Sequence, residues 1–268
     1  MSDGWYADAA EDYERGRLPY PSGLGSVFEA AVGRGGRLLD LGCGPGTVGL
    51  RLTELFDDLV GVDRDPGMVR HARSRAAAIG LEAARFIRAS AEELPADLGT
   101  FRVVVVAQAF HWFDRPRAAE SIVRVLEPGG HCVVLYAWSL RGDPVADMAR
   151  PVPPYAAMDE LGESLGGRRG DLPSTAPDDE SGSMSAAGLD GPVGWQVPGG
   201  DVVVSQADDL IARWLSRSDA TGFRTGSRRA AYVAAAEELL RNASESGFAE
   251  RIRGARLNVW TKPIGWQP

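Results

Sequence analysis

The chain has 268 residues, of which 44% are hydrophobic and 25% charged, a composition typical of a folded domain of α/β size. Its formal net charge of −8 disfavours a nucleic-acid substrate, because phosphate binding needs clustered Arg and Lys. The two cysteines have no paired spacing and predict neither a disulfide framework nor a metal site. There is no basic and apolar leader, and no apolar run approaches the roughly 20 residues of a membrane helix, so we expect a cytoplasmic protein without a membrane partner.

Strands and helices alternate through the first half of the chain. Residues 1–36 are expected to hold two helices, one containing Tyr13 and Arg17 and one over 22–32. Strands are then predicted at 37–41, 59–62, 85–88, 102–107 and 131–136, with helices at 47–55, 65–79 and 115–126 between them. Such alternation predicts an α/β fold with a doubly wound parallel sheet.

The alternation stops near Leu140. Residues 141–200 are rich in Gly, Pro, Ser and Asp, and a strand over 202–205, helices over 208–217 and 227–242 and a strand over 255–261 follow. We therefore predict four regions. They are a helical N-terminal segment (1–36), a ligand-binding core (37–140), a partly disordered insertion or lid (141–200) and a C-terminal part of the same sheet domain (201–268).

A glycine-rich turn follows the first predicted strand. Asp40 opens the stretch, and Gly42, Gly44 and Gly46 alternate with other residues after it. Glycines between a strand and a helix allow a ligand to approach the backbone closely. About 20 residues later Asp63 ends the second strand, where a carboxylate can accept both hydroxyls of a ribose. Nicotinamide-binding enzymes share these features, so the pattern indicates a nucleoside cofactor without choosing one.

The segment Asp-Leu-Gly-Cys-Gly-Pro-Gly over 40–46 closely resembles the first motif of class I S-adenosylmethionine-dependent methyltransferases. The resemblance implies S-adenosyl-L-methionine as cofactor and a Rossmann-like, seven-stranded sheet with an antiparallel last strand. It also implies that Met68 packs near the adenine and that 88–95 binds its edge, through Ser90, the backbone of Ala91 and Glu92. Family members often carry Asp at the position of Ser90, which weakens the expected contact to the adenine amino group.

A second resemblance covers 107–114, Ala-Gln-Ala-Phe-His-Trp-Phe-Asp, and is to the type-11, trans-aconitate methyltransferase-like branch. Ala107 and Gln108 are thereby implied in cofactor binding. Tyr13, Arg17 and the following Leu-Pro-Tyr-Pro resemble the same branch, which implies that both side chains close over the cofactor. The alternative for Tyr13 and Arg17 is the solvated face of an N-terminal helix.

Four further residues are candidates for the acceptor side of the site. His111 follows the fourth strand, where a general base is plausible, and the alternative is a helix-start residue with local hydrogen bonds. Trp112, Tyr136 and Trp138 are either walls of an acceptor pocket or core residues. Cys43 is interpreted as a small filler of the glycine loop rather than as a nucleophile.

These features predict a methyltransferase that acts on a small organic molecule, with bacterial secondary metabolism as a candidate setting. The chain lacks the Asn/Asp-Pro-Pro-Tyr tetrad of enzymes that methylate nucleic-acid amino groups. One alternative is a tailoring enzyme or binding protein of the same fold that holds the cofactor without methyl transfer, and a weaker one is a nicotinamide dehydrogenase. Residues 141–200 are expected to form a lid, helical near 155–165 and loose near 170–194, or else a surface excursion. The acceptor and the subunit number are not predicted.

Overall fold

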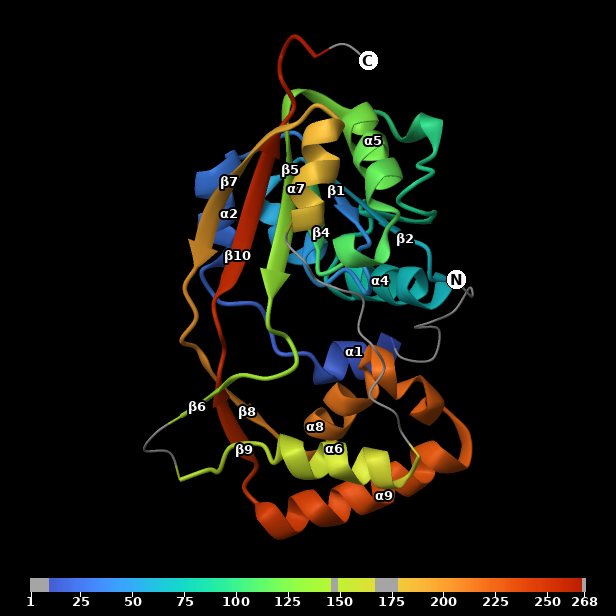
Figure 1. Cartoon of the computed structure of the whole chain (residues 1–268), viewed down its shortest axis with the longest axis vertical. Coiled ribbons are helices and arrows are strands. Elements are labelled where there is room, and N and C mark those ends of the chain that lie inside the picture. The colour runs from blue at the N-terminus through green and yellow to red at the C-terminus, as the bar shows by residue number, and fades with distance from the viewer. Residues whose placement is uncertain (1–9, 146–148, 167–177, 267–268) are drawn as a thin grey trace.

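A seven-stranded sheet dominates the upper part of the molecule in the computed structural model, which describes residues 10–145, 149–166 and 178–266 (Figure 1). The strand order is β3-β2-β1-β4-β5-β10-β7. β10 is antiparallel to both of its neighbours, while the strands from β3 to β5 are parallel, as the sequence predicts. The strands are β1 (Arg37–Leu41), β2 (Asp58–Asp63), β3 (Arg85–Arg88), β4 (Phe101–Ala107), β5 (Leu126–Ala137), β7 (Asp190–Val197) and β10 (Ala255–Thr261).

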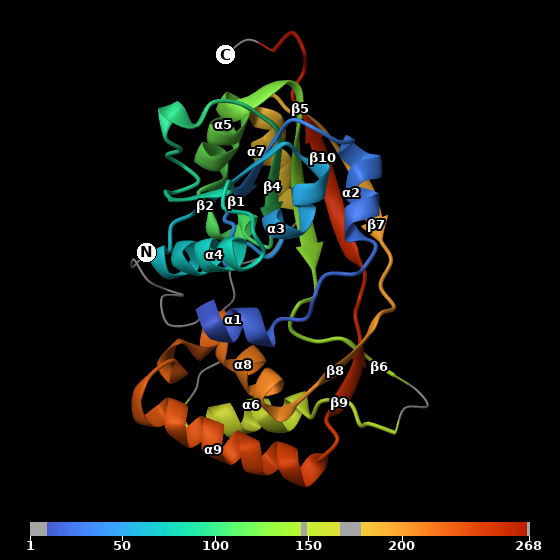
Figure 2. The ribbon, with the colours of Figure 1, turned by 180° about the vertical axis from the view of Figure 1, so that it is seen from behind.

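Helices cover both faces of this sheet, which explains the continuous apolar run of β4. Val104 and Val106 pack with the helices of one face, whereas Val103 and Val105 pack with those of the other, and all four are fully buried. The first face carries α5 (Arg115–Val125) and α7 (Asp178–Ala186). The second carries α2 (Leu24–Val32), α3 (Gly49–Leu52) and α4 (Pro66–Ala78) (Figure 2).

Below the carboxyl ends of the parallel strands lies a smaller unit, here called the helical subdomain (Figure 1). It is built from the described parts of 138–166 and 198–254. It contains α6 (Tyr155–Ser164), α8 (Ala207–Leu215) and α9 (Gly226–Ala243), with a three-stranded sheet of β6 (Asp143–Pro144), β9 (Phe248–Arg251) and β8 (Val202–Ser205). Its own apolar core includes Met158, Leu215 and Tyr232, which are buried.

The N-terminal helix α1 (Ala10–Gly16) lies between the two units (Figure 2). A Cβ on Gly16 would lie 2.1 Å from the backbone nitrogen of Arg213 in α8, so only glycine allows this approach. Asp12 accepts two hydrogen bonds from Arg229 of α9, and Glu14 forms ion pairs with His71 and Arg75 of α4. The helix therefore connects the sheet domain to the helical subdomain.

The structure differs from the expected layout of 141–200. The helix near 155–165 is present as α6, but 178–197 is regular structure of the sheet domain: α7 packs on α5, and β7 is an edge strand beside β10. The expectation of a loose segment is therefore wrong for 178–194, and 170–177 lies outside the described residues. Conversely, α8 and α9 pack with α6 rather than on the sheet.

Buried polar contacts explain why a sequence so poor in apolar residues is helical over α7. Glu180 is 3% exposed and accepts hydrogen bonds from Tyr136, Asn258 and Trp260, which belong to β5 and β10.

In the described part of the chain, no helix combines the length and apolarity that crossing a bilayer requires.

Candidate functional site

A first cavity of about 150 Å³ opens at the carboxyl ends of β1, β2, β3 and β4, where an open α/β sheet binds its ligand. Several residues expected to bind the cofactor line it. These are Tyr13, Gly42, Gly44, Asp63, Met68, Ala91, Glu92, Ala107 and Gln108. Four sequence candidates do not line it, namely Arg17, Asp40, Gly46 and Ser90.

The glycine loop forms the floor of this cavity. A Cβ on Gly42 would lie 2.6 Å from the Cβ of Ala109, so Gly42 is required by packing against the protein itself. Gly44 has a φ of 53°, and a Cβ there would meet no protein atom within 4 Å. Gly44 therefore leaves open space on the cavity side, which a closely approaching ligand can use.

Asp63 stands at the rim with its carboxylate fixed by the backbone. Its Oδ2 accepts a hydrogen bond from the Gly44 nitrogen at 2.8 Å, and its Oδ1 accepts one from the Asp65 nitrogen at 2.8 Å. Burial raises the pKa of this carboxyl, although both backbone hydrogen bonds oppose the rise. Each oxygen keeps a lone pair for a further donor, so the carboxylate suits the two hydroxyls of a ribose.

Asp40 has a different role from the one expected. It is 1% exposed, and its Oδ2 accepts a hydrogen bond from the Gly49 nitrogen at 2.8 Å, behind the glycine loop. Its Oδ1 has no hydrogen-bond partner among the described residues. Burial raises the pKa of this carboxyl to about 7, and the nearby Asp63 charge adds to the rise. Asp40 thus supports the loop from beneath.

A second cavity, of about 420 Å³, adjoins the first and extends toward the helical subdomain. Tyr13, Gln108 and Trp112 line both cavities. Gln108 has a φ of 54°, which is rare for a residue other than glycine, and its side chain donates a hydrogen bond to the Ala137 carbonyl. Strained backbone of this kind is found preferentially at functional sites.

His111 lines the second cavity, in the short 3₁₀ helix Phe110–Trp112 after β4. Its ring centroid lies 5.1 Å from that of Trp112. Burial lowers the pKa of His111, and the positive charge of Arg115 lowers it further. The imidazole is therefore neutral at pH 7 and able to accept a proton.

Three other candidates have mixed outcomes. Trp138 lines the second cavity and is 57% exposed, so it forms part of the mouth. Arg17 lines the second cavity rather than the first. Tyr136 lines neither, since its hydroxyl donates a hydrogen bond to Glu180 on the α7 face of the sheet. Of the two alternatives for Tyr136, the structure supports the core one.

Sequence reasoning missed the wall that the helical subdomain contributes. Arg141, Arg213, Trp214 and Arg217 all line the second cavity. Arg213 and Trp214 lie in the last turn of α8, and Arg217 follows two residues after the helix ends at Leu215. The four-residue spacing of Arg213 and Arg217 was the available signal, but nothing local indicated that these side chains face residues 13–17 and 138–141.

Comparisons with known proteins agree with this geometry. Residues 38–130 match a family described as a methyltransferase domain. An uncharacterized methyltransferase of Mycobacterium tuberculosis is 37% identical over 170 residues, which cover 57% of this chain and 66% of that protein. The demethylmenaquinone methyltransferase of Thermus thermophilus is 43% identical over 102 residues, covering 37% of this chain and 46% of that one. The alignments thus span less than two thirds of these relatives.

A solved structure extends the likeness over the fold. The YcgJ protein of Bacillus subtilis superposes with a TM-score of 0.52 at 19% identity, over 90% of this chain and 98% of that one. At this identity the match concerns the fold alone.

Proposed function

We propose that the chain is a class I S-adenosylmethionine-dependent methyltransferase that transfers the methyl group of that cofactor to a small organic molecule, which its match to a methyltransferase domain and its methyltransferase relatives support. The observation that carries the proposal is the junction of the two cavities at Tyr13, Gln108 and Trp112. A cofactor in the first cavity and an acceptor in the second would meet there, which is the arrangement that methyl transfer between two bound molecules needs.

The residues of the first cavity fit this cofactor. Asp63 would hold the ribose hydroxyls, Met68 and the backbone at Ala91 would contact the adenine, and Gly42 and Gly44 would border the methionine part. When bound, the cofactor supplies a sulfonium-linked methyl group, whose transfer leaves the electron pair of the broken bond on sulfur. The apolar side chain of Trp112, at the junction of the two cavities, would keep water away from that group.

His111 is the candidate for proton transfer on the acceptor side. A hydroxyl acceptor loses its proton as an oxygen lone pair forms the new bond to carbon, whereas an ammonium acceptor must lose a proton first to free its lone pair. A neutral imidazole in the second cavity can take the proton in either case. The lowered pKa of His111 keeps the base form available at neutral pH. An acceptor that is already deprotonated needs only the positioning that the cavity provides.

The proposal is tested by incubating the protein with S-adenosylmethionine and a panel of small acceptors and separating the products by chromatography. We expect S-adenosylhomocysteine and a methylated product in equal amounts. Binding of S-adenosylhomocysteine in calorimetry without turnover on any acceptor would favour a protein that holds the cofactor without transferring methyl. Lack of S-adenosylhomocysteine binding would reject the proposal as a whole.

A further inference from the structure

The wall of the second cavity is rich in guanidinium groups. Among the residues that the structure describes, five arginines line this cavity: Arg17, Arg141, Arg213, Arg217 and Arg253. Asp219 is the one acidic residue in the same wall. The concentration of positive charge contrasts with the chain as a whole, whose formal net charge is −8.

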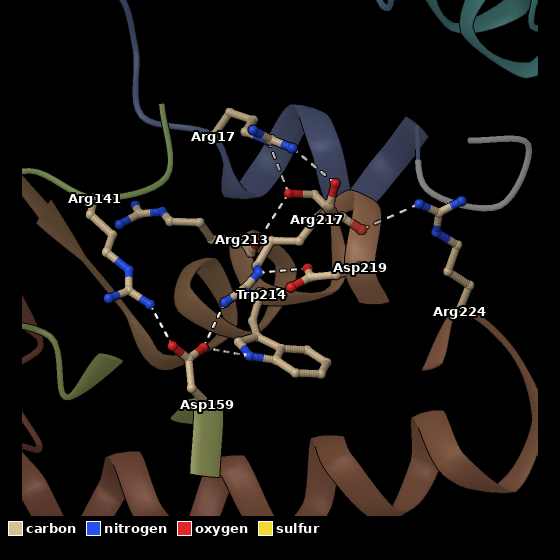
Figure 3. Close-up of polar contacts among 9 residues, drawn as sticks. Arg17, Arg141, Asp159, Arg213, Trp214, Arg217, Asp219 and Arg224 are labelled. Atoms are coloured by element: carbon tan, nitrogen blue, oxygen red, sulfur yellow. Dashed lines mark hydrogen bonds and ion pairs between the residues drawn. The ribbon is translucent and has the colours of Figure 1, made fainter. Parts of the chain in front are cut away.

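Four of these arginines have carboxylate partners, which neutralise most of the charge. Arg213 pairs with Glu250, and both are buried. Arg217 bridges Asp159 and Asp219, Asp159 also pairs with Arg141, and Arg253 pairs with Asp143. Four guanidinium groups thus pair with four carboxylates, and Arg141 and Arg217 share Asp159. Figure 3 shows Asp159 between these two arginines.

Arg17 is the exception. Its Nε donates a hydrogen bond to the Ser216 hydroxyl at 3.1 Å, its Nη1 donates one to the Ser139 hydroxyl at 3.1 Å, and its Nη2 donates one to the Ser216 carbonyl at 2.9 Å. The guanidinium lies 4.5 Å from the ring centroid of Tyr13. No ion pair involves Arg17 within the described residues, so neutral groups alone hold this half-buried cation.

The fixed position of Arg17 leaves donors for a ligand. A guanidinium carries more N–H groups than these three contacts use, and each Nη keeps one. Arg141 lines the same cavity, with a side chain that is 46% exposed and only Nη2 engaged with Asp159. Two guanidinium groups that are held in place, with N–H groups still free to donate, match the paired oxygen acceptors of a carboxylate or phosphate.

We propose that the methyl acceptor carries an oxyanion group, a carboxylate or a phosphate, that binds Arg17 with help from Arg141. None of the five arginines lines the first cavity, which is where the methyl donor is placed. The oxyanion is therefore bound outside the cavity of the methyl donor, as a recognition group that stays free in the product. This inference rests on the proposed function, since it names the class of acceptor for the same site.

Matched probes test the inference on the full chain saturated with S-adenosylhomocysteine. Calorimetry compares para-hydroxybenzoate and indoleacetate with their carboxamides, which keep the shape and remove the charge, and phenyl phosphate with phenol, which lacks the oxyanion group. We expect the charged member of a pair to bind at least about tenfold more tightly. The better anion identifies carboxylate or phosphate as the source. Equal affinity within every pair, or no binding of any oxyanion probe at about 10 mM, would overturn the inference.

Variants assign the preference to the named residues. In Arg17→Gln the preference for the charged probes should fall to about threefold or less, because glutamine keeps a donor but not the charge. Arg141→Gln should lower it partially, and since Arg217 still satisfies Asp159, this variant stays informative if Arg17→Gln folds poorly. Arg34→Gln, on the opposite end of the sheet domain and paired with Glu29, is the matched control and should change nothing. An unchanged preference in both cavity variants would overturn the assignment.

The amino-acid part of the cofactor also carries a carboxylate, so its contact with Arg17 must be distinguished. The Arg17→Gln protein is titrated with S-adenosylhomocysteine and with methylthioadenosine, which lacks the amino-acid carboxylate. Unchanged affinity for both supports an acceptor-binding arginine. A loss confined to S-adenosylhomocysteine would show that Arg17 serves the cofactor instead. If wild-type protein binds the oxyanion probes but not S-adenosylhomocysteine, the proposed methyltransferase function fails while the oxyanion site stands.

Discussion

The two adjoining cavities are built in different ways. The first is made by the ends of four neighbouring strands, and its contacts come from glycine turns, small side chains and one carboxylate fixed by backbone N–H groups. The second is made by side chains from segments that are distant in sequence, such as Arg17 and Arg213, and Arg17 is itself held by Ser216, 199 residues away. Under the proposed assignment, cofactor recognition is a local property of the sheet edge, whereas acceptor recognition depends on how separate segments pack.

This difference has a consequence for variation in the sequence. A substitution at the sheet edge changes backbone geometry that the cofactor itself requires, so few alternatives work. In the second cavity a side chain can change while its segment keeps its packing, as long as the buried Arg213–Glu250 pair holds the helical subdomain together. The four predictions below probe this contrast.

The largest effect is expected for Gly44→Val. The new side chain would project into the space where the cofactor binds, so affinity for S-adenosylhomocysteine should fall below detection in calorimetry. Gly80→Val is the matched control, because Gly80 also has a positive φ, 73°, and open space around it, but lies outside both cavities. Both variants should lose roughly 1–2 kcal/mol of stability from backbone strain. Normal binding by Gly44→Val would show that this loop does not hold the cofactor.

His111→Gln separates proton transfer from positioning. If His111 takes the acceptor proton, kcat should fall by about 10²–10⁴-fold while affinity for S-adenosylhomocysteine is kept. The pKa of His111 is lowered, so wild-type kcat should be flat near pH 7. It should decline only when the pH falls below the usual pKa of a histidine side chain, where the ring becomes protonated. The variant should lack this decline. A loss below about tenfold would leave His111 as a wall of the cavity.

Asp63→Ala should weaken S-adenosylhomocysteine binding by roughly 1–3 kcal/mol, since the ribose hydroxyls lose a charged acceptor. The Gly44 and Asp65 N–H groups also lose their partner, so the loop should become less ordered. Asp58→Ala, at the opposite end of β2 and paired with Arg37, is the control for general loss of a carboxylate from this strand. Equal affinity in wild type and Asp63→Ala would remove Asp63 from the site.

The smallest effect concerns stability and Asp40. Its pKa is raised to about 7 in the folded chain, so between roughly pH 4 and pH 7 the folded state holds a proton that the unfolded state has released. The stability contribution of Asp40 is therefore greatest at low pH and is lost as pH rises, by about 1 kcal/mol from pH 5 to pH 6. Asp40→Asn should remove this slope in urea unfolding measured across pH. Identical slopes in both proteins would contradict the raised pKa.

The same contrast explains what the sequence could predict. The parallel strands, the glycine turn and Asp63 follow from patterns a few residues long, and the structure places Gly42, Gly44, Asp63 and Met68 around one cavity. Asp40 shares that motif, yet its side chain turns behind the loop toward Gly49, which spacing alone does not reveal. For α7 and β7 no local signal exists, because buried Glu180 and pairing with β10 determine their structure. The arginine wall likewise depends on distant segments.

One consequence of the topology concerns engineering. The helical subdomain leaves the sheet domain twice, after β5 and again between β7 and β10, with α7 and β7 returning to the sheet in between. Exchanging it for that of another protein therefore requires two coordinated replacements, and a graft of 141–200 alone would remove an edge strand. Gly16 adds a third constraint, because α1 must match the new α8 surface. The proposed acceptor site is thus one unit in space but is divided among three stretches of sequence.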